Sequence, residues 1–251
     1  MYIFLGSVHT FYYTPKDIFH LNSNASSYLH DDALEEAASR GDLSLFLRKE
    51  KEGGQTFFRS LIVAMKYGHE NIISYLWNMK YIPLESFLCV AVFFEKMNWI
   101  TCCFKENISD FCGPLLNAIF VNNFSLVRLI FDQFSHHYDD IERMKRSKQN
   151  LSHRGLMLAC EYKTDKRIIS YLVNNINDIN ILNDILYLAV ANGNSMLATE
   201  MFVHGANDAI NALHIALETK REEMIPLIIS STPSIPINWS EILTELTSSK
   251  I

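Results

Sequence analysis

Apolar residues recur along the chain in short clusters, each followed by a polar turn and a second apolar stripe. Aligning these clusters places one alanine at the same register in seven segments, here called the register alanines: Ala37, Ala64, Ala91, Ala118, Ala159, Ala189 and Ala216. The intervals between them are 27, 27, 27, 41, 30 and 27 residues. A repeated period of about 20–50 residues is typical of solenoid proteins, in which each repeat is one supersecondary unit. The pattern therefore predicts about seven repeats within residues 32–233.

Each repeat has the pattern of a helix, a tight turn and a second helix. Residues that tolerate left-handed backbone recur four places after the alanine: Gly41, Gly68, Asn122 and Gly193. Such residues end a helix and reverse the chain. Eight or nine places after the alanine comes an apolar pair such as Ile72-Ile73, and apolar residues three or four positions further on complete a helical stripe. We expect an alanine in the first helix because a larger side chain would overpack neighbouring helices.

The 41-residue interval exceeds the 27-residue period by 14 residues and places an insertion at residues 135–154. The insertion is the most polar stretch of the chain, and it is predicted as a loop that binds a partner or acts as a hinge. Its candidate contact residues are basic: Arg143, Lys145, Arg146 and Lys148. The alternative is a solvated helix extension with a mixed-charge face. Residues 1–31 and 234–251 are predicted as an N-terminal cap segment and a C-terminal capping helix, because solenoid ends must be covered.

The amino-acid composition restricts the fold classes and the kinds of partner that are compatible with the chain. With 49% hydrophobic and 20% charged residues, the chain is neither disordered nor a coiled coil. Nine glycines and six prolines are few, which favours helices over strands. The formal net charge of -6 argues against a nucleic-acid partner. No apolar stretch is long enough to span a bilayer and the N-terminus lacks the pattern of a signal peptide, so no membrane partner and a cytoplasmic location are expected.

Candidate chemistry is sparse. The five cysteines are odd in number and are expected to be reduced core residues. No metal-ligand spacing and no phosphate-binding glycine motif occurs, so no metal, no cofactor and no catalytic residue is predicted. The alternative function is a helical-repeat enzyme or enzyme regulator with a site near the insertion. Its candidate pair is His153 with Cys160 or Cys112.

Four short segments resemble the ankyrin repeat. They are Pro-Leu-x-x-Ala at 114–118, Ala-Leu-His-Ile-Ala at 212–216, Gly-His-Glu-Asn-Ile-Ile at 68–73 and Ala-Asn-Gly-Asn at 191–194. The resemblance implies an all-α, ankyrin-like helical-repeat solenoid of about seven helix pairs. Ankyrin repeats are about 33 residues long, so the 27-residue period suggests shortened turns between repeats. Glu95, Lys163 and Lys220 stand where the family prefers glycine. By the same resemblance, His69 and His214 are expected to hydrogen-bond backbone groups at the turns.

The resemblance also indicates where a partner would bind. The two residues before each inter-helix turn are the family's usual contact positions on the concave face. In this chain they supply an aromatic strip flanked by basic residues: Tyr67, Phe93, Phe94, Phe120 and Tyr162, with Lys66 and Arg40. Clustered aromatics with a polar rim are typical of interface hot spots. If the shortened repeats shift the register, some of these rings would instead fill the space between helices.

The predicted function is therefore binding of another protein by a monomer, without catalysis. The divergent repeats resemble those of ankyrin proteins that intracellular bacteria or large viruses place in host cells. On that resemblance the chain would be an effector, its partner a host protein and its location the host cytoplasm.

Overall fold

The computed structural model of the chain describes residues 33–136 and 140–231. Over these ranges the chain forms fourteen α-helices and one short 3₁₀ turn, and no strand occurs there, which confirms the predicted all-α class. The chain divides into two compact units, Met1–Val121 and Asn122–Ile251. The predicted terminal segments, 1–31 and 234–251, lie outside the described residues.

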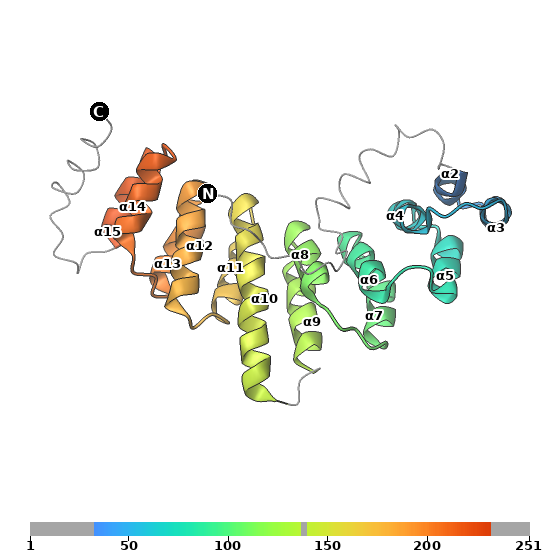
Figure 1. Cartoon of the computed structure of the whole chain (residues 1–251), viewed down its shortest axis with the longest axis horizontal. Helices are drawn as coiled ribbons and strands as arrows, with labels where there is room; N and C mark the ends of the chain where they lie inside the picture. Colours follow the sequence, from blue (N-terminus) through green and yellow to red (C-terminus); the bar gives the residue numbers. More distant parts are fainter. Residues whose placement is uncertain (1–32, 137–139, 232–251) are drawn as a thin grey trace. The chain divides into compact units, whose positions relative to one another are not determined.

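The first unit is built from helix pairs that follow one another along the chain (Figure 1). Its helices are α2 (Ala33–Arg40), α3 (Leu43–Lys51), α4 (Phe57–Tyr67), α5 (Glu70–Met79), α6 (Leu84–Phe93), α7 (Met97–Phe104) and α8 (Cys112–Phe120). Each of α2, α4 and α6 packs on the helix that follows it. The same three helices and α8 also pack in series, α2 on α4, α4 on α6 and α6 on α8. First helices of the pairs therefore form one continuous row.

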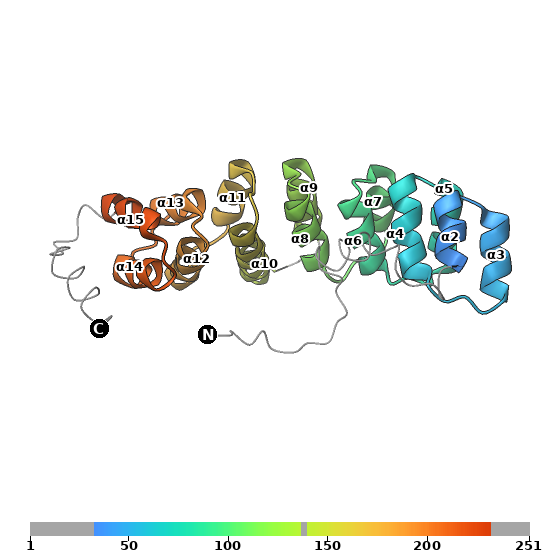
Figure 2. The ribbon, with the colours of Figure 1, turned by 90° about the horizontal axis from the view of Figure 1, so that it is seen from above.

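The second unit repeats this arrangement. Its helices are α9 (Phe124–Ser135), α10 (Ile141–Glu161), α11 (Lys166–Val173), α12 (Ile179–Ala191), α13 (Ser195–Val203), α14 (Ala209–Glu218), η1 (Glu222–Met224) and α15 (Ile225–Ser231). Figure 2 shows α10, α12 and α14 in one row and α11, α13 and α15 in a second row above it in that view, and contacts run within and between the rows. Within each unit the chain is thus a stack of helix pairs.

The register alanines lie where these helices meet. All seven have 0% of their surface exposed. The apolar pair of each second helix also faces inward, and both members are fully buried in Ile72-Ile73 and Ile168-Ile169. Small residues at the first-helix contacts let the rows pack closely, because a larger side chain would have to push a neighbouring helix away. The predicted register is confirmed.

The turns inside the pairs share one hydrogen-bond pattern. In five repeats the backbone N–H five places after the register alanine donates to that alanine's carbonyl oxygen, over 2.7–3.1 Å; the donors are Asp42, His69, Lys96, Asn194 and Arg221. This bond belongs to the Schellman ending of a helix, which needs a left-handed residue one position earlier. That residue is glycine in three of these turns, but Glu95 and Lys220 adopt the same conformation, with φ of 54° and 58°. The absence of glycine therefore does not change the turn.

The Ala159 repeat ends its first helix in a different way. Helix α10 ends at Tyr162 in an extended conformation (φ -121°, ψ 154°), and Lys163 is not left-handed. The side chain of Thr164 is buried, and Asp165 then caps α11 by accepting a hydrogen bond from the backbone N–H of Arg167. The backbone N–H of Asp165 donates to Oδ1 of Asn122 over 2.7 Å. This turn is held by side chains and is one residue longer, because α11 begins seven places after Ala159 whereas α5 begins six places after Ala64. The 30-residue interval arises in the next helix: α12 begins 20 residues after Ala159, as α4 begins 20 residues after Ala37, and the three additional residues lie in α12 before Ala189.

Side chains at the turns tie each pair to the one before it. Nε2 of His69 lies 2.9 Å from the carbonyl oxygen of Ser39, as the sequence predicted for this histidine. Asn194 and Arg221 occupy the same place in their turns and donate to the carbonyl oxygens of Ala159 and Ala191. These hydrogen bonds satisfy carbonyl groups that the helix ends leave without partners. The side chain of His214, by contrast, is exposed and makes no hydrogen bond to the described residues.

The insertion is helical from Ile141 onward, so the prediction of a loop was wrong for this part of it. Helix α10 runs without interruption from Ile141 to Glu161 and carries all four basic candidates of the insertion. Oδ1 of Asp140 caps its start by accepting the backbone N–H groups of Glu142 and Arg143, over 2.8 and 3.2 Å. Neither glycine nor proline occurs between Ile141 and Arg154, so nothing in the segment breaks a helix. The alternative of a solvated helix extension is the observed structure.

The left-handed turn residues provide a stability test. Lys220→Gly is expected to raise the free energy of unfolding by about 0.5–1 kcal/mol, because glycine adopts φ near 58° without the steric cost that Cβ adds. Gly68→Ala is the converse variant. Its φ is 76° and an added Cβ would meet no atom within 4 Å, so a loss of about 1 kcal/mol would be a backbone effect alone. Urea unfolding followed by circular dichroism measures both, and a destabilised Lys220→Gly protein would contradict the turn assignment.

Candidate functional site

The predicted contact residues of the first unit gather at one end of the first helices. Arg40, Tyr67, Phe93 and Phe120 are the last residues of α2, α4, α6 and α8. Each stands two or three places after a register alanine, so the common register puts all four at the same end of a row of packed helices. Phe94 follows as the C-cap of α6. We call Tyr67, Phe93, Phe94 and Phe120 the aromatic face.

Three of these rings contact one another. The rings of Phe93 and Phe120 are stacked, with centroids 5.8 Å apart and planes at 18°. Phe94 meets Phe93 edge to face at 5.1 Å. All three side chains are half-buried, so they are neither core residues nor fully exposed. Aromatic pairs in these geometries are worth about 0.5–1.5 kcal/mol beyond the area they bury, and the contact holds the rings in a fixed orientation.

Tyr67 and its neighbours form the polar end of the aromatic face. The side chain of Tyr67 is 57% exposed, the largest exposure of any aromatic residue in the described part of the chain. Nζ of Lys66 lies 5.5 Å from the Tyr67 ring centroid, within the range of a cation–π contact. The guanidinium of Arg40 pairs with the carboxylate of Glu36 on the same helix. The rim therefore carries positive charge beside a tyrosine that solvent reaches.

Two groups of predicted residues are not part of the aromatic face as defined here, because they belong to the second unit. Tyr162, half-buried at the end of α10, belongs to the second unit, so its place in a continuous strip stays a prediction. The four basic residues of the insertion lie on α10 of the second unit as well, where Nζ of Lys145 pairs with Glu142 over 3.0 Å.

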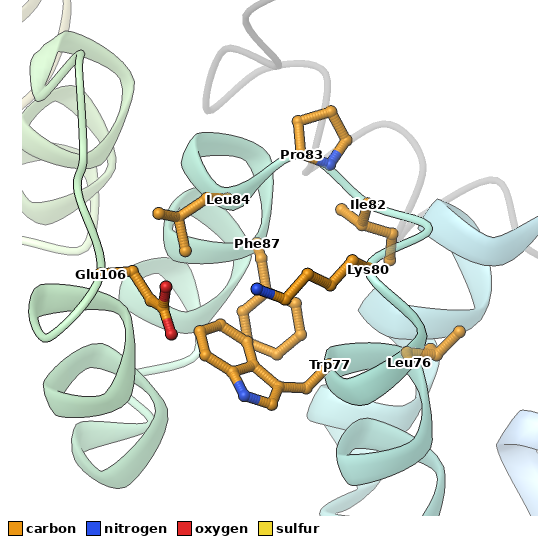
Figure 3. A pocket seen from close by; sticks show the side chains of 8 residues that line it. All are labelled: Leu76, Trp77, Lys80, Ile82, Pro83, Leu84, Phe87 and Glu106. Atoms are coloured by element: carbon orange, nitrogen blue, oxygen red, sulfur yellow. The ribbon is translucent and has the colours of Figure 1, made fainter.

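A pocket that the sequence did not indicate opens at the other end of the helices of the first unit (Figure 3). Its volume is about 210 Å³, and it lies where α5 ends and α6 begins. The rings of Trp77 and Phe87 meet edge to face at 4.9 Å and form its apolar wall. Lys80 and Glu106 project over it from opposite sides. A pocket below the roughly 300–1,000 Å³ of ordinary ligand sites has room for about one side chain of a partner.

Three of the five thiols are poor candidates for nucleophiles. Burial raises the pKa of Cys160 and of Cys103 to about 12, and it also raises that of Cys89. A thiol with such a pKa stays protonated at neutral pH, whereas a nucleophilic cysteine needs the thiolate. His153 and Cys160 lie seven residues apart on the same helix, about 10 Å along its axis, which is too far for direct proton transfer. Burial lowers the pKa of His153.

All five cysteines are free, and four of them are buried, as the sequence predicted; Cys102 is partly exposed. Within residues 33–136 and 140–231, no group of three or more His, Cys, Asp or Glu side chains is placed to hold a metal ion. In the same ranges no helix combines the length and apolarity needed to cross a bilayer. Comparison with known proteins gives no match to a family model, a curated protein or a solved structure.

Proposed function

We propose that the chain is a protein-binding module, an ankyrin-like stack of helix pairs that holds a partner protein against the aromatic face. The observation that carries the proposal is the cluster of half-buried rings at the ends of α6 and α8, with the exposed Tyr67 at the corresponding end of α4. Three of these four residues end consecutive first helices, so one repeated backbone feature presents the surface.

The chemistry of this face suits a protein partner. Aromatic side chains bury much area with little loss of rotamer freedom, and they are enriched where interface energy concentrates. Their mutual contacts in the free chain fix the rings before binding, which lowers the entropy cost of ordering them. Lys66 and Arg40 supply the polar rim that excludes water around such a centre. A partner with an apolar segment bordered by acidic residues fits this face best.

Substitution of Tyr67 tests the proposal. Tyr67→Ala is expected to weaken partner binding by about tenfold or more, while helical content and the melting temperature stay nearly unchanged because the side chain is 57% exposed. Affinity purification with mass spectrometry first identifies a stoichiometric partner. Titration calorimetry of that partner with the wild-type and variant chains then gives the two dissociation constants.

Met79→Ala is the matched control, because Met79 is 44% exposed but ends α5 on the opposite side of the same helix pair. Equal losses from Tyr67→Ala and Met79→Ala, or an unchanged affinity in Tyr67→Ala, would contradict the assignment of the aromatic face. Phe93→Ala adds a second test, with an expected loss of both affinity and some stability because that ring is half-buried.

A further inference from the structure

The first half of α10 projects from the second unit. No residue between Ile141 and Asn150 is buried, whereas the buried side chains of this helix begin at Leu151. Figure 1 shows the start of α10 extending beyond the ends of α11 and α12, the two helices on which its second half packs. About three turns of helix therefore contribute no buried side chain to the second unit.

Arginines line one face of this helix. With about 100° of rotation per residue, Arg143, Arg146 and Arg154 lie within about 80° of one another around the axis. All three are exposed. Lys145 and Lys148 fall on the opposite side, in the sector of the buried residues Ser152 and Ala159. The set Arg143, Arg146 and Arg154 is called the arginine face below.

The charge of this segment is opposite to that of the rest of the chain. Residues 140–154 contain five basic and two acidic side chains, a net charge of +3, so the other residues carry -9 within a total of -6. Lys145 is paired with Glu142. No ion pair joins Arg143 or Arg146 to any residue that the structure describes. The guanidinium groups of these two residues thus remain available to an anionic partner.

We infer that the arginine face binds an acidic segment of a protein. Guanidinium groups match carboxylates in paired hydrogen bonds, which a lysine ammonium cannot reproduce. The face extends from Arg143 to Arg154, eleven residue intervals or about 16 Å along the helix axis, so its partner presents carboxylates over a similar length. This inference concerns the second unit and does not rest on the proposed role of the aromatic face.

Two other anionic partners fit less well. A nucleic acid would extend past the short basic face onto a chain that is otherwise acidic, and phosphate neutralisation needs a wider basic surface. A membrane would need apolar side chains beside the arginines, but the residues between them on this face are Ser147 and Asn150. Complementary charge of limited length therefore favours an acidic protein segment.

Binding of a fluorescein-labelled, glutamate-rich peptide to the full chain tests the inference by fluorescence anisotropy. The wild-type chain is expected to bind it with an affinity that falls as salt rises. The double variant R143E/R146E should weaken binding by about tenfold or more. The matched double variant K145E/K148E makes the same change of net charge on the opposite side of the same helix, and it should change the affinity by less than about threefold.

Each other outcome contradicts the inference. Equal losses in the two double variants would show attraction by net charge alone. Undetectable peptide binding would show that the arginine face does not bind acidic segments. Tighter binding of a single-stranded RNA or of phosphatidylserine vesicles than of the peptide would assign the face to nucleic acid or lipid. Circular dichroism checks the fold of each variant, and R143Q/R146Q, which keeps helix-forming side chains, replaces the charge-reversed variant if that protein is unfolded.

Discussion

Phe46→Ala is expected to lower the free energy of unfolding by about 3–5 kcal/mol, the usual cost of truncating a buried phenylalanine. Phe46 lies on α3 with 0% of its surface exposed. Its ring meets that of Tyr75 on α5 edge to face, with centroids 6.0 Å apart. Removal of the Phe46 ring would leave a cavity between the second helices α3 and α5. Both helices are stabilised by the contact between Phe46 and Tyr75.

Urea unfolding of the two proteins by circular dichroism measures this loss. Phe57→Ala is the control within the same unit: Phe57 stacks on Tyr81 at 4.2 Å but is only half-buried, so its truncation should cost clearly less. A loss below about 1 kcal/mol for Phe46→Ala would be that of a surface position. It would contradict the placement of α3 against α5.

Ala189→Phe is expected to cost about 1–3 kcal/mol or more through overpacking. Ala189 is fully buried on α12, the helix that packs on α10, α13 and α14. Its carbonyl oxygen accepts the turn hydrogen bond from Asn194 over 2.8 Å. A phenyl ring at this position would push α12 away from its neighbours and disturb that turn as well.

Ala191→Phe tests whether size matters only at the register position. Ala191 lies two residues further along the same helix and is partly exposed, so its ring could extend toward solvent at little cost. Thermal unfolding of both variants compares them. Equal destabilisation would show that the alanine register has no special packing role, and the repeat pattern would lose its physical explanation.

The alanine register let the sequence predict most of the fold. One small residue per repeat and an apolar pair eight or nine places later were enough to place first and second helices in both units. The pattern is predictive because the first helices of all repeats pack closely on their neighbours at the same position. Only a small side chain fits there, so alanine occurs both at position 64 and at position 216. The turns at Glu95 and Lys220 kept the left-handed conformation without glycine, since the hydrogen bonds to the register alanine fix the backbone there.

The polarity of the insertion is compatible with both a loop and a solvated helix extension, and its helix propensity favours the helix. Residues 141–154 are rich in Arg, Lys, Glu, Gln and Met, which are good helix formers, and Asp140 provides a cap. A polar segment with these residues forms a helix when its continuation, here Leu151 to Cys160, is anchored in the core. The pattern of apolar residues in the sequence therefore predicts the buried half of α10, from Leu151 onward, but gives no information on the structure of the exposed half, from Ile141 to Asn150.

The aromatic face could be predicted from the sequence because its residues occupy repeated positions. The pocket beside Trp77 could not, because its residues do not. Tyr67, Phe93 and Phe120 share one register position, so their common place could be deduced. The ring contacts and half-burial of the phenylalanines depend on side-chain packing and could not. The pocket joins Lys80 to Glu106, which are 26 residues apart and follow no common register; only the fold brings them over Trp77.

Site-specific photo-crosslinking tests the central claim, that the aromatic face holds a partner protein, most directly. A photoreactive phenylalanine analogue replaces Tyr67 in one chain and Met79 in another, two exposed positions at opposite ends of one helix pair. After irradiation with the purified partner, the account predicts a covalent adduct from position 67 and little or none from position 79. An adduct from position 79 alone, or equal yields from the two positions, would contradict it.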